Sequence, residues 1–251
     1  MKKLFLFTSI LLHCTFLLAQ DVPALIREAD KLESSLKESS AYEKFKQVLK
    51  IEPRNYYALW KCSELCSRIV NRQNTKEKKA DFFNAGRIYA ETAIKTNPNG
   101  ADGYYALAVA MGRRALMESG KDKVKAVKEI KINAEKAIKL NARHWRAWHV
   151  IGKWHYEVNN LSTLEKAALK IFYGGLPQAS LTESIKAYER AMQLEPDFAL
   201  NFLELAKAYK KNDQKDKAIV QLTKLAGLRE RTEDDARIKS DGRKLLQTLQ
   251  S

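Results

Sequence analysis

One residue pattern recurs five times along the chain and constrains its fold more than any other feature. Each copy places four residues at positions i, i+3, i+4 and i+7, and the third is always small. This spacing puts them on one helix face, and the small residue lets a second helix approach closely. The quartets are Leu25, Glu28, Ala29, Leu32; Leu59, Cys62, Ser63, Cys66; Tyr104, Leu107, Ala108, Met111; Trp148, Ile151, Gly152, His155; and Phe202, Leu205, Ala206, Tyr209.

A second helical pattern follows each quartet, with its seam at i, i+4 and i+7. The seams are Ala41, Phe45, Val48; Gly86, Ala90, Ala93; Ile130, Ala134, Ala137; Ser184, Tyr188, Ala191; and Ala218, Leu222, Leu225. The first four segments end in the similar phrases VLKIEPRN, AIKTNPNG, AIKLNARH and AMQLEPDF. Proline in three of these phrases ends a helix, because it lacks the backbone N–H and clashes with the preceding turn.

Paired helices with this spacing and a closing proline are the signature of tetratricopeptide repeats. We therefore predict an all-α fold, a tetratricopeptide-like α-solenoid of about five irregular helix pairs with a C-terminal capping helix. The spacing is longer than the usual period of about 34 residues: 45 from Pro53 to Pro98, 44 from Pro98 to Ala142 and 54 from Ala142 to Pro196. The excess is expected to lengthen helices or form loops at 69–83, 113–127 and 157–182.

The longest of these segments is predicted to contain a helix of its own. Ser162 with Glu165, and Ser180 with Glu183, both match the capping-box pattern. A Gly-Gly-Leu-Pro stretch at 174–177 breaks the chain between them.

The C-terminal residues are predicted to close the solenoid. Thr232 is in position to cap a helix over 232–250 whose first turn is acidic. Terminal repeats need such a cap because an open solenoid end exposes apolar surface. We expect a repeat domain at 22–228 and a capping helix at 229–251. The residues expected to cover the last repeat are Ile238, Leu245, Leu246 and Leu249.

Residues 1–20, MKKLFLFTSILLHCTFLLAQ, have the form of a secretory signal. Lys2 and Lys3 precede an apolar run, and Ala19 offers a small residue for cleavage. We expect a signal peptide at 1–19, cleaved near Ala19, and export to the periplasm or cell envelope of a bacterium. An uncleaved anchor is the alternative.

The chain is strongly basic, with 45 Lys+Arg against 30 Asp+Glu and a net charge of +15. An exported protein meets no chromosomal DNA, so we expect no nucleic-acid partner. Basic charge in that compartment suits an acidic protein or peptide, with peripheral contact to an anionic membrane surface. The run 121–146 holds nine Lys/Arg and three Asp/Glu. We interpret it first as a solvated helix face, with an anionic docking surface as the alternative.

Nothing in the sequence indicates catalysis, a cofactor or a metal site. The glycine pair at 174–175 lacks the Lys-Ser/Thr of a phosphate-binding loop, and no Gly-x-Ser-x-Gly occurs. The histidines at 144, 149 and 155 lack the i, i+4 spacing of paired ligands on a helix. Cys62 and Cys66 are predicted to be buried thiols, because i, i+4 Cβ atoms lie about 5–6 Å apart and a disulfide requires about 3.8 Å.

The stretch 152–198, GKWHYEVNNLSTLEKAALKIFYGGLPQASLTESIKAYERAMQLEPDF, resembles the regulator of microtubule dynamics proteins. The shared features are a Gly-x-Trp-x-Tyr-Glu-Val run, a Leu-Ser, a helix, a Gly-Gly-x-Pro turn and a repeat helix ending in Glu-Pro. Upstream, AIKTNPNGADGYYALAVAMGRRAL is also similar, so the resemblance covers roughly 85–225. It implies tetratricopeptide-like repeats that bind a partner without catalytic residues. Eukaryotic members are associated with microtubules, spindle poles or mitochondria–ER contacts.

The first helix of each pair is expected to line a concave groove, with the residues beside each quartet facing it. Aromatic anchors with basic neighbours suit an acidic peptide. We thus predict a non-enzymatic scaffold that binds a protein or peptide. The alternatives are a cytoskeleton- or microtubule-associated adaptor and an accessory domain to an envelope enzyme. By register, the candidate groove residues are Tyr57, Trp60, Tyr105, Arg113, Arg146, His149, Lys153 and Lys207, with Glu64, Val109, Leu203 and Lys211 beside them.

Overall fold

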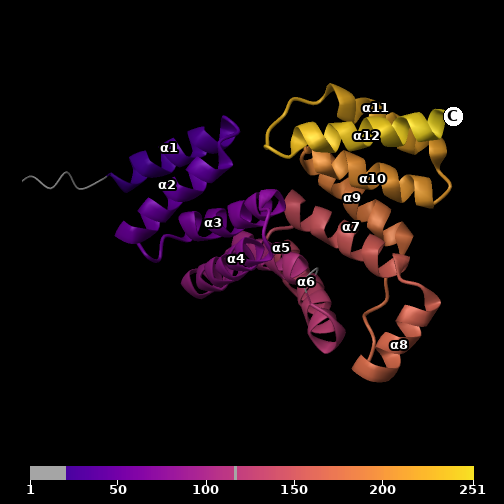
Figure 1. The fold of residues 1–251 in the computed structure, drawn as a ribbon, viewed down its shortest axis with the longest axis horizontal. Coiled ribbons are helices and arrows are strands. Elements are labelled where there is room, and N and C mark those ends of the chain that lie inside the picture. Colours follow the sequence, from indigo (N-terminus) through magenta and orange to yellow (C-terminus); the bar gives the residue numbers. More distant parts are fainter. Residues whose placement is uncertain (1–20, 116–117) are drawn as a thin grey trace, which may run out of the picture.

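The computed structural model describes residues 21–115 and 118–251, and the predicted signal peptide lies outside them. The described chain is a series of helices without strands, which confirms the predicted fold class (Figure 1). The helices are α1 (Val22–Ser34), α2 (Glu38–Ile51), α3 (Tyr56–Ile69), the short 3-10 helix η1 (Val70–Arg72), α4 (Lys76–Thr96), α5 (Ala101–Ala115), α6 (Gly120–Leu140), α7 (Trp145–Asn160), α8 (Thr163–Tyr173), α9 (Leu181–Leu194), α10 (Ala199–Lys211), α11 (Lys215–Gly227) and α12 (Asp235–Gln250).

The helices pack as the repeat pattern predicts. The closest packing is within the pairs α1/α2, α3/α4, α5/α6, α7/α9 and α10/α11, and α12 covers α10 and α11. The small third residue of each quartet lies where the two helices approach. A Cβ on Gly152, for example, would lie 2.7 Å from the fully buried ring of Tyr188. Cys62 and Cys66 are unbridged buried thiols, as predicted, and burial raises the pKa of Cys66 to about 12.

The similar phrases end their helices at the same place in four repeats. Helices α2, α4, α6 and α9 all stop two residues before position 53, 98, 142 or 196. The residue between is extended at Asn97, Asn141 and Glu195, with φ from −138° to −144°, and Glu52 lies near this region at φ −122° and ψ 84°. A proline forces this conformation on the residue before it. Asn141 adopts the same extended conformation although Ala142, and not a proline, follows it. A proline is therefore not the only feature that sets this turn.

The extra residues of the long repeats are accommodated in two ways. Helices α4 and α6 are 21 residues long, against 14 for α2, so the first two excess segments mostly extend the second helix of a pair. The third forms the separate helix α8. Its predicted capping box is present, because Ser162 Oγ accepts from the Glu165 N–H and Glu165 accepts from the Ser162 N–H. Gly174 ends the helix with φ +71°, a conformation that favours glycine.

The second predicted capping box is only half formed. Ser180 Oγ accepts from the Glu183 N–H at 3.4 Å, but the Glu183 carboxylate pairs with Lys186. The Ser180 N–H donates instead to Nδ1 of His155, at 3.3 Å. The prediction of a reciprocal pair here was therefore wrong, because tertiary packing brings a different acceptor to Ser180.

The closing helix starts later than predicted. It begins at Asp235, and Thr232 does not cap it. The Thr232 hydroxyl donates to the Asp235 carboxylate, which also accepts the N–H groups of Arg231 and Thr232 and so stabilises a local turn. The apolar residues behave as expected, since Ile238 and Leu249 are buried and Leu245 and Leu246 pack against the same core.

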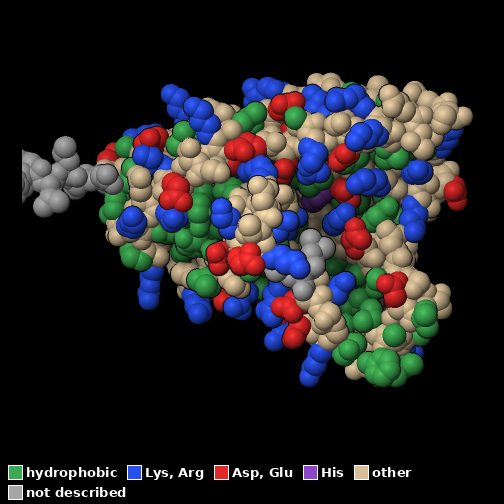
Figure 2. All heavy atoms as spheres, viewed as in Figure 1, with side chains coloured by type: hydrophobic (Ala, Val, Ile, Leu, Met, Phe, Trp, Pro, Cys, Tyr) green, Lys and Arg blue, Asp and Glu red, His purple; other side chains and the backbone are tan. Residues whose placement is uncertain are grey.

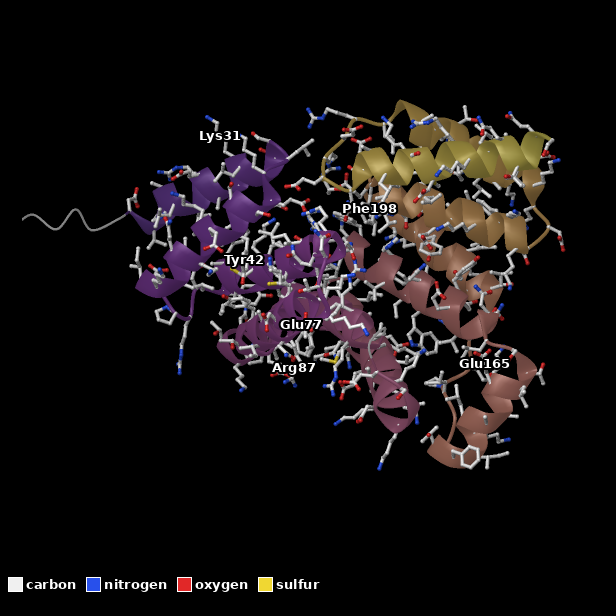
Figure 3. All side chains as sticks on the ribbon, in the orientation of Figure 1. Lys31, Tyr42, Glu77, Arg87, Glu165 and Phe198 are labelled. Atoms are coloured by element: carbon white, nitrogen blue, oxygen red, sulfur yellow. The ribbon has the colours of Figure 1, made fainter. Side chains whose placement is uncertain are left out.

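The solenoid curls so that its two ends approach one another. Figure 1 shows the α11–α12 connection beside the end of α1 and α2, and the contact is direct at Glu38 and Glu233. Side chains occupy the space between the two ends (Figure 3). Among the described residues no helix combines the length and the apolar character needed to cross a bilayer.

Candidate functional site

Most of the predicted aromatic groove residues are covered by neighbouring repeats. Trp60, Tyr105 and His149 occupy the same position in successive repeats, and their side chains are 7%, 8% and 8% exposed. Tyr57 is half-buried, and its hydroxyl donates to Asp30 at 2.8 Å. These side chains therefore join one repeat to the next, and little of their surface is available to a partner.

An ion cluster centred on Glu64 occupies the inner surface of the N-terminal half. Glu64 is 3% exposed, and its Oε1 accepts from the Tyr105 hydroxyl at 2.9 Å. The same oxygen lies 3.1 Å from Arg68 Nη2 and 3.1 Å from Arg146 Nε, while Lys61 Nζ lies 3.6 Å from Oε2. One carboxylate on α3 thus holds side chains from α5 and α7. We call these five residues the N-terminal wall.

The protonation states of this wall follow from its charges. Burial alone would raise the pKa of Glu64, but Arg68, Arg146 and Lys61 together hold it well below its usual range. Burial raises the pKa of Tyr105 far above its ordinary value, and the Glu64 carboxylate adds to that effect. At neutral pH Glu64 is consequently an anion and Tyr105 a neutral donor.

The ion cluster continues to the opposite end of the chain. The fully buried Glu38 accepts from Arg72 at 2.7 Å and from Arg68 at 3.3 Å. The Glu38 N–H donates to Glu233 at 2.6 Å, and the Glu233 N–H donates to Glu38 at 3.3 Å. This is the reciprocal arrangement of a capping box, formed by residues 195 positions apart. Arg72 also lies 3.3 Å from Glu233 and 3.6 Å from Asp234.

We call the contacts between Glu38, Arg72, Glu233 and Asp234 the clasp. Arg113, a predicted groove residue on α5, faces the same region. Burial lowers the pKa of Arg113, and the nearby charge of Asp234 opposes that shift. The N-terminal inner surface is accordingly occupied by the chain's own acidic residues.

A neutral hydrogen-bond chain separates the two halves of the inner surface. His149 Nδ1 lies 3.0 Å from Oδ1 of Asn201, whose Nδ2 donates to the Tyr188 carbonyl. Phe198, labelled in Figure 3, packs edge-on against the His149 ring at 4.9 Å. Burial lowers the pKa of His149 to about 4, so the ring is neutral and donates through Nδ1.

A second carboxylate, Glu204, organises the inner surface of the C-terminal half. It is 5% exposed and lies 2.7 Å from Lys153 Nζ and 2.9 Å from Lys207 Nζ. Burial raises the pKa of Glu204, but the two lysines lower it by more. Unlike the arginines around Glu64, these lysine side chains are 43% and 38% exposed.

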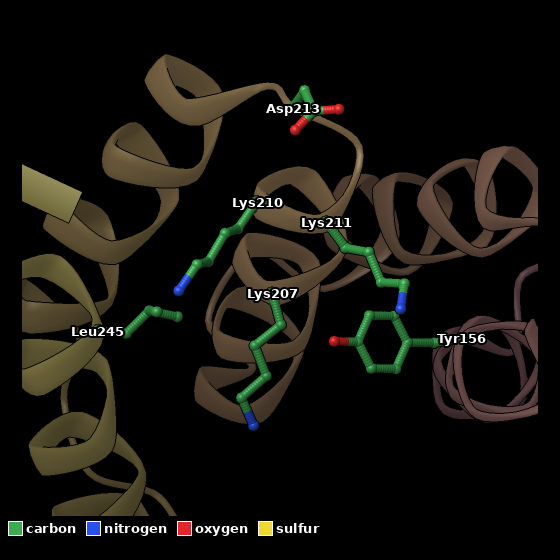
Figure 4. A pocket seen from close by; sticks show the side chains of 6 residues that line it. All are labelled: Tyr156, Lys207, Lys210, Lys211, Asp213 and Leu245. Atoms are coloured by element: carbon green, nitrogen blue, oxygen red, sulfur yellow. The ribbon is translucent and has the colours of Figure 1, made fainter. Parts of the chain in front are cut away.

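An open pocket adjoins Glu204, with a volume of about 480 Å³ (Figure 4). Lys207, Lys210 and Lys211 line it from α10, and in Figure 4 the end of Lys211 lies beside the Tyr156 ring. Leu245 of α12 and Asp213 complete the lining. Within the described residues the ion pairs of this region involve Lys153 and Lys207, leaving Lys210 and Lys211 unpaired. We call Lys153, Tyr156, Glu204, Lys207, Lys210 and Lys211 the C-terminal wall.

The structure thus places six of the eight predicted residues around two carboxylates. Tyr57, Trp60, Tyr105 and Arg146 lie around the Glu64 cluster, and the Arg146 guanidinium is 5.9 Å from the centre of the Trp60 ring. Lys153 and Lys207 lie around Glu204. Of the other two, Arg113 faces the clasp and His149 lies in the neutral chain. Glu33 of α1 also belongs to the Glu64 cluster, because it pairs with Lys61 and Arg68. The prediction missed the acidic partners and most of the C-terminal pocket: Glu33, Glu38, Glu204, Glu233, Asp234, Tyr156 and Lys210.

One sequence signal could have revealed part of what was missed. Lys61 and Glu64, and likewise Glu204 and Lys207, are opposite charges three residues apart on first helices. Such spacing brings side chains together on a helix. The Glu38–Glu233 contact has no comparable local signal. In the described residues, no group of His, Cys, Asp or Glu is arranged to hold a metal ion.

The sequence matches the family model of regulator of microtubule dynamics protein 1-3 over residues 25–250. The chain belongs to this family. Its relatives include regulator of microtubule dynamics protein 1 of Bos taurus, 26% identical over 90% of this chain and 71% of that protein. The Mus musculus protein of the same name is 26% identical over 91% of this chain and 75% of its own length.

The family membership agrees with the fold. A thermophilic tetratricopeptide-repeat protein of Thermus thermophilus superposes with a TM-score of 0.65 at 15% identity, covering 92% of this chain and 99% of that structure. The curled array of helix pairs in this family member is therefore a tetratricopeptide-like solenoid. Such folds typically serve as non-enzymatic scaffolds with extended binding surfaces.

Proposed function

We propose that this protein is a non-enzymatic adaptor that binds an acidic peptide segment of a partner protein at the C-terminal wall. The observation that carries the proposal is the pair of unpaired, exposed lysines, Lys210 and Lys211, in the open pocket. The N-terminal wall is a poorer candidate because Glu64, Glu38 and the clasp already neutralise its cations. Complementary charge steers association and selects acidic partners.

The pocket offers more than charge to such a segment. Tyr156 and Leu245 supply apolar surface beside the lysines. Aromatic side chains of this kind contribute contact area as anchors at interfaces. An acidic segment carrying one apolar residue would therefore match both features of the C-terminal wall.

The test is photo-cross-linking in cells from a residue beside the pocket, followed by mass spectrometry and affinity measurement with the captured segment. We expect Lys210→Glu with Lys211→Glu to weaken binding by about tenfold or more, since two attractive charges become repulsive. The matched control is Lys215→Glu with Lys224→Glu, which changes the net charge by the same amount at exposed residues of α11. Equal losses in both double variants would overturn the assignment to the pocket.

We place the protein in the periplasm or cell envelope, on the support of the signal-like residues 1–20. Cell fractionation with mass spectrometry of the N-terminus tests this. Export predicts an envelope fraction that begins near Gln20, whereas a cytosolic protein with Met1 intact would overturn it.

A second candidate function is a cytoskeleton-associated adaptor, which the names of its relatives favour. Co-sedimentation of the purified protein with assembled microtubules tests this candidate. Pelleting that is abolished by Lys210→Glu with Lys211→Glu would support it through the same pocket, and absence of pelleting would remove it.

A further inference from the structure

Helix α8 stands apart from the rest of the solenoid. It is the one described helix with no buried residue, and its packing is essentially confined to α6 (Figure 1). Tyr173 is half-buried and lies toward Gly120 at the start of α6, where a Cβ on that glycine would be 3.0 Å from the Tyr173 hydroxyl. One face of α8 therefore meets the solenoid and the opposite face has no covering.

The uncovered face is apolar. Leu164, Ile171 and Phe172 are 80%, 75% and 73% exposed, more than any other large hydrophobic residue described. With Ala168 they occupy positions i, i+4, i+7 and i+8, which form a single stripe along a helix. Figure 2 shows the resulting hydrophobic patch at the α8 end of the molecule.

Exposed lysines outnumber acidic residues near this patch. Lys121, Lys123 and Lys125 lie in the first turns of α6, which contacts α8, and Lys166 and Lys170 lie on the side of α8 away from the stripe. Glu165 on α8 and Asp122 on α6 are the exposed acidic residues among them. The described ion pairs nearest along the chain, Arg114–Glu118, Lys131–Glu135 and Lys186–Glu183, involve none of the five lysines. The Lys166 ammonium donates to the Asn159 carbonyl. The apolar stripe thus belongs to a region with a net positive charge.

The size of the patch decides what can cover it. A stable protein dimer buries about 800 Å² on each partner, from some 20–30 residues. The stripe consists of three large side chains on a helix of 11 residues, so it is too small to hold a second copy of the chain. A short helix with an apolar stripe on one side and lysines on the other is instead typical of helices that lie in a membrane interface, where anionic headgroups add to apolar burial.

We propose that α8 docks this protein onto an anionic lipid bilayer, with Leu164, Ile171 and Phe172 inserted below the headgroups and the lysines of α8 and of the start of α6 attracted to the negative charge of those headgroups. The stripe lies at the tip of a projecting element, so a flat surface can reach it without displacing any helix (Figures 1 and 2). This inference does not rest on the proposed peptide binding, because the C-terminal wall lies on different helices.

The test is co-sedimentation of the full chain with vesicles of phosphatidylglycerol and phosphatidylcholine, compared with vesicles of phosphatidylcholine alone. We expect Leu164→Ser, Ile171→Ser and Phe172→Ser together to weaken binding to anionic vesicles by about tenfold or more. Because α8 contains no buried residue, this triple variant should unfold at the same temperature as the wild type. Ile88→Ser, Ile132→Ser and Val220→Ser, on exposed residues elsewhere, form the matched control and should bind normally.

A second pair of variants tests the contribution of the lysines on α6 and α8. Lys121, Lys123, Lys166 and Lys170 changed to Gln should weaken binding to anionic vesicles, whereas the same change at Lys76, Lys78, Lys215 and Lys224 should have less effect. All proteins compared share residues 1–20. Binding unaffected by the α8 triple variant, or equal binding to neutral vesicles, would overturn the proposal. So would self-association of the wild type that the triple variant abolishes without any change in vesicle binding.

Discussion

The two inner walls are built on the same repeat register but carry inverted charges. Lys61 and Glu204 occupy equivalent positions, as do Glu64 and Lys207, so one i, i+3 ion pair appears twice with opposite polarity. In the N-terminal wall the carboxylate is surrounded by two arginines and a buried lysine. In the C-terminal wall it meets two half-exposed lysines.

One scaffold thus forms a closed surface and an open surface, because the two carboxylates have different cationic partners. Arginine presents planar donors that bridge several helices, and it tolerates burial in ion pairs, whereas lysine keeps its charge near water. The N-terminal wall therefore ties α3, α5 and α7 together and is closed further by the clasp. The C-terminal wall leaves cations accessible. The first wall therefore holds helices together, whereas the second presents cations to solvent.

The largest effect is expected from Glu64→Gln. The substitution preserves shape but removes the anion that Arg68, Arg146 and Lys61 share in a buried site. Arg68 and Lys61 keep Glu33 as a partner, whereas Arg146 loses its carboxylate. Breaking a buried ion network in this way costs about 3–5 kcal/mol in the free energy of unfolding. Urea denaturation followed by circular dichroism measures this loss in the free energy of unfolding. Glu91→Gln removes an exposed pair with Arg87 and should change the free energy by less than about 0.5 kcal/mol. Similar losses in both variants would contradict a closed N-terminal wall.

The sequence predicted the fold much better than it predicted the site. The quartets and the closing phrases give periodic, local signals, and each helix pair follows from residues within one repeat. The site depends on contacts between repeats, such as Glu64 with Arg146, and on the curl that brings Glu233 to Glu38. The curl is the sum of small rotations at every repeat, which residue spacing does not specify. The register therefore placed Trp60 and Tyr105 on the inner side without showing that they are covered.

Acid should weaken the His149 hydrogen-bond chain and the N-terminal wall in different pH ranges. The pKa of His149 is about 4 in the folded protein against 6.5 ordinarily, so the folded state favours the neutral ring. The unfolded state gains a proton as pH falls through 6.5, and about 2 kcal/mol of stability is lost between pH 7 and pH 5. Glu64 has a lowered pKa, so its contribution is complete above about pH 4.5 and is lost only below that.

Urea unfolding of wild type and His149→Gln at pH 7 and pH 5 tests this separation. The variant should lose most of the pH dependence in that interval. His155→Gln is the matched control, because the pKa of this half-buried histidine is also lowered, mainly by burial and by Lys131. An unchanged slope in His149→Gln would show that another group titrates there.

Opening the clasp should have a smaller effect. Glu233→Gln with Asp234→Asn removes the charges that face Arg72 and should reduce the free energy of unfolding by about 1.5 kcal/mol. This is the low end of the range for hydrogen bonds to charged groups, because Arg72 and Glu233 are partly exposed. It should also increase the radius of gyration measured by small-angle X-ray scattering. Glu195→Gln breaks the exposed pair with Arg231 and leaves the ends in contact. An unchanged radius in the clasp variant would mean that packing alone holds the ends together.

The smallest stability effect is expected from Glu204→Gln. This variant also tests directly whether the C-terminal wall is an open cationic surface. Lys153 and Lys207 are partly exposed, so water solvates them when the anion is removed, and the expected loss is below about 1 kcal/mol. The freed ammonium group of Lys207 would then join Lys210 and Lys211 in facing the pocket, while Lys153 keeps its pair with Glu157. Binding of an acidic peptide, measured by fluorescence anisotropy, should tighten, and the gain should shrink as salt rises. Glu157→Gln removes an exposed partner of Lys153 alone and should tighten peptide binding less than Glu204→Gln does. Weaker peptide binding in Glu204→Gln would mean that this carboxylate positions the lysines for a ligand, and the C-terminal wall would then be an organised site like its N-terminal counterpart.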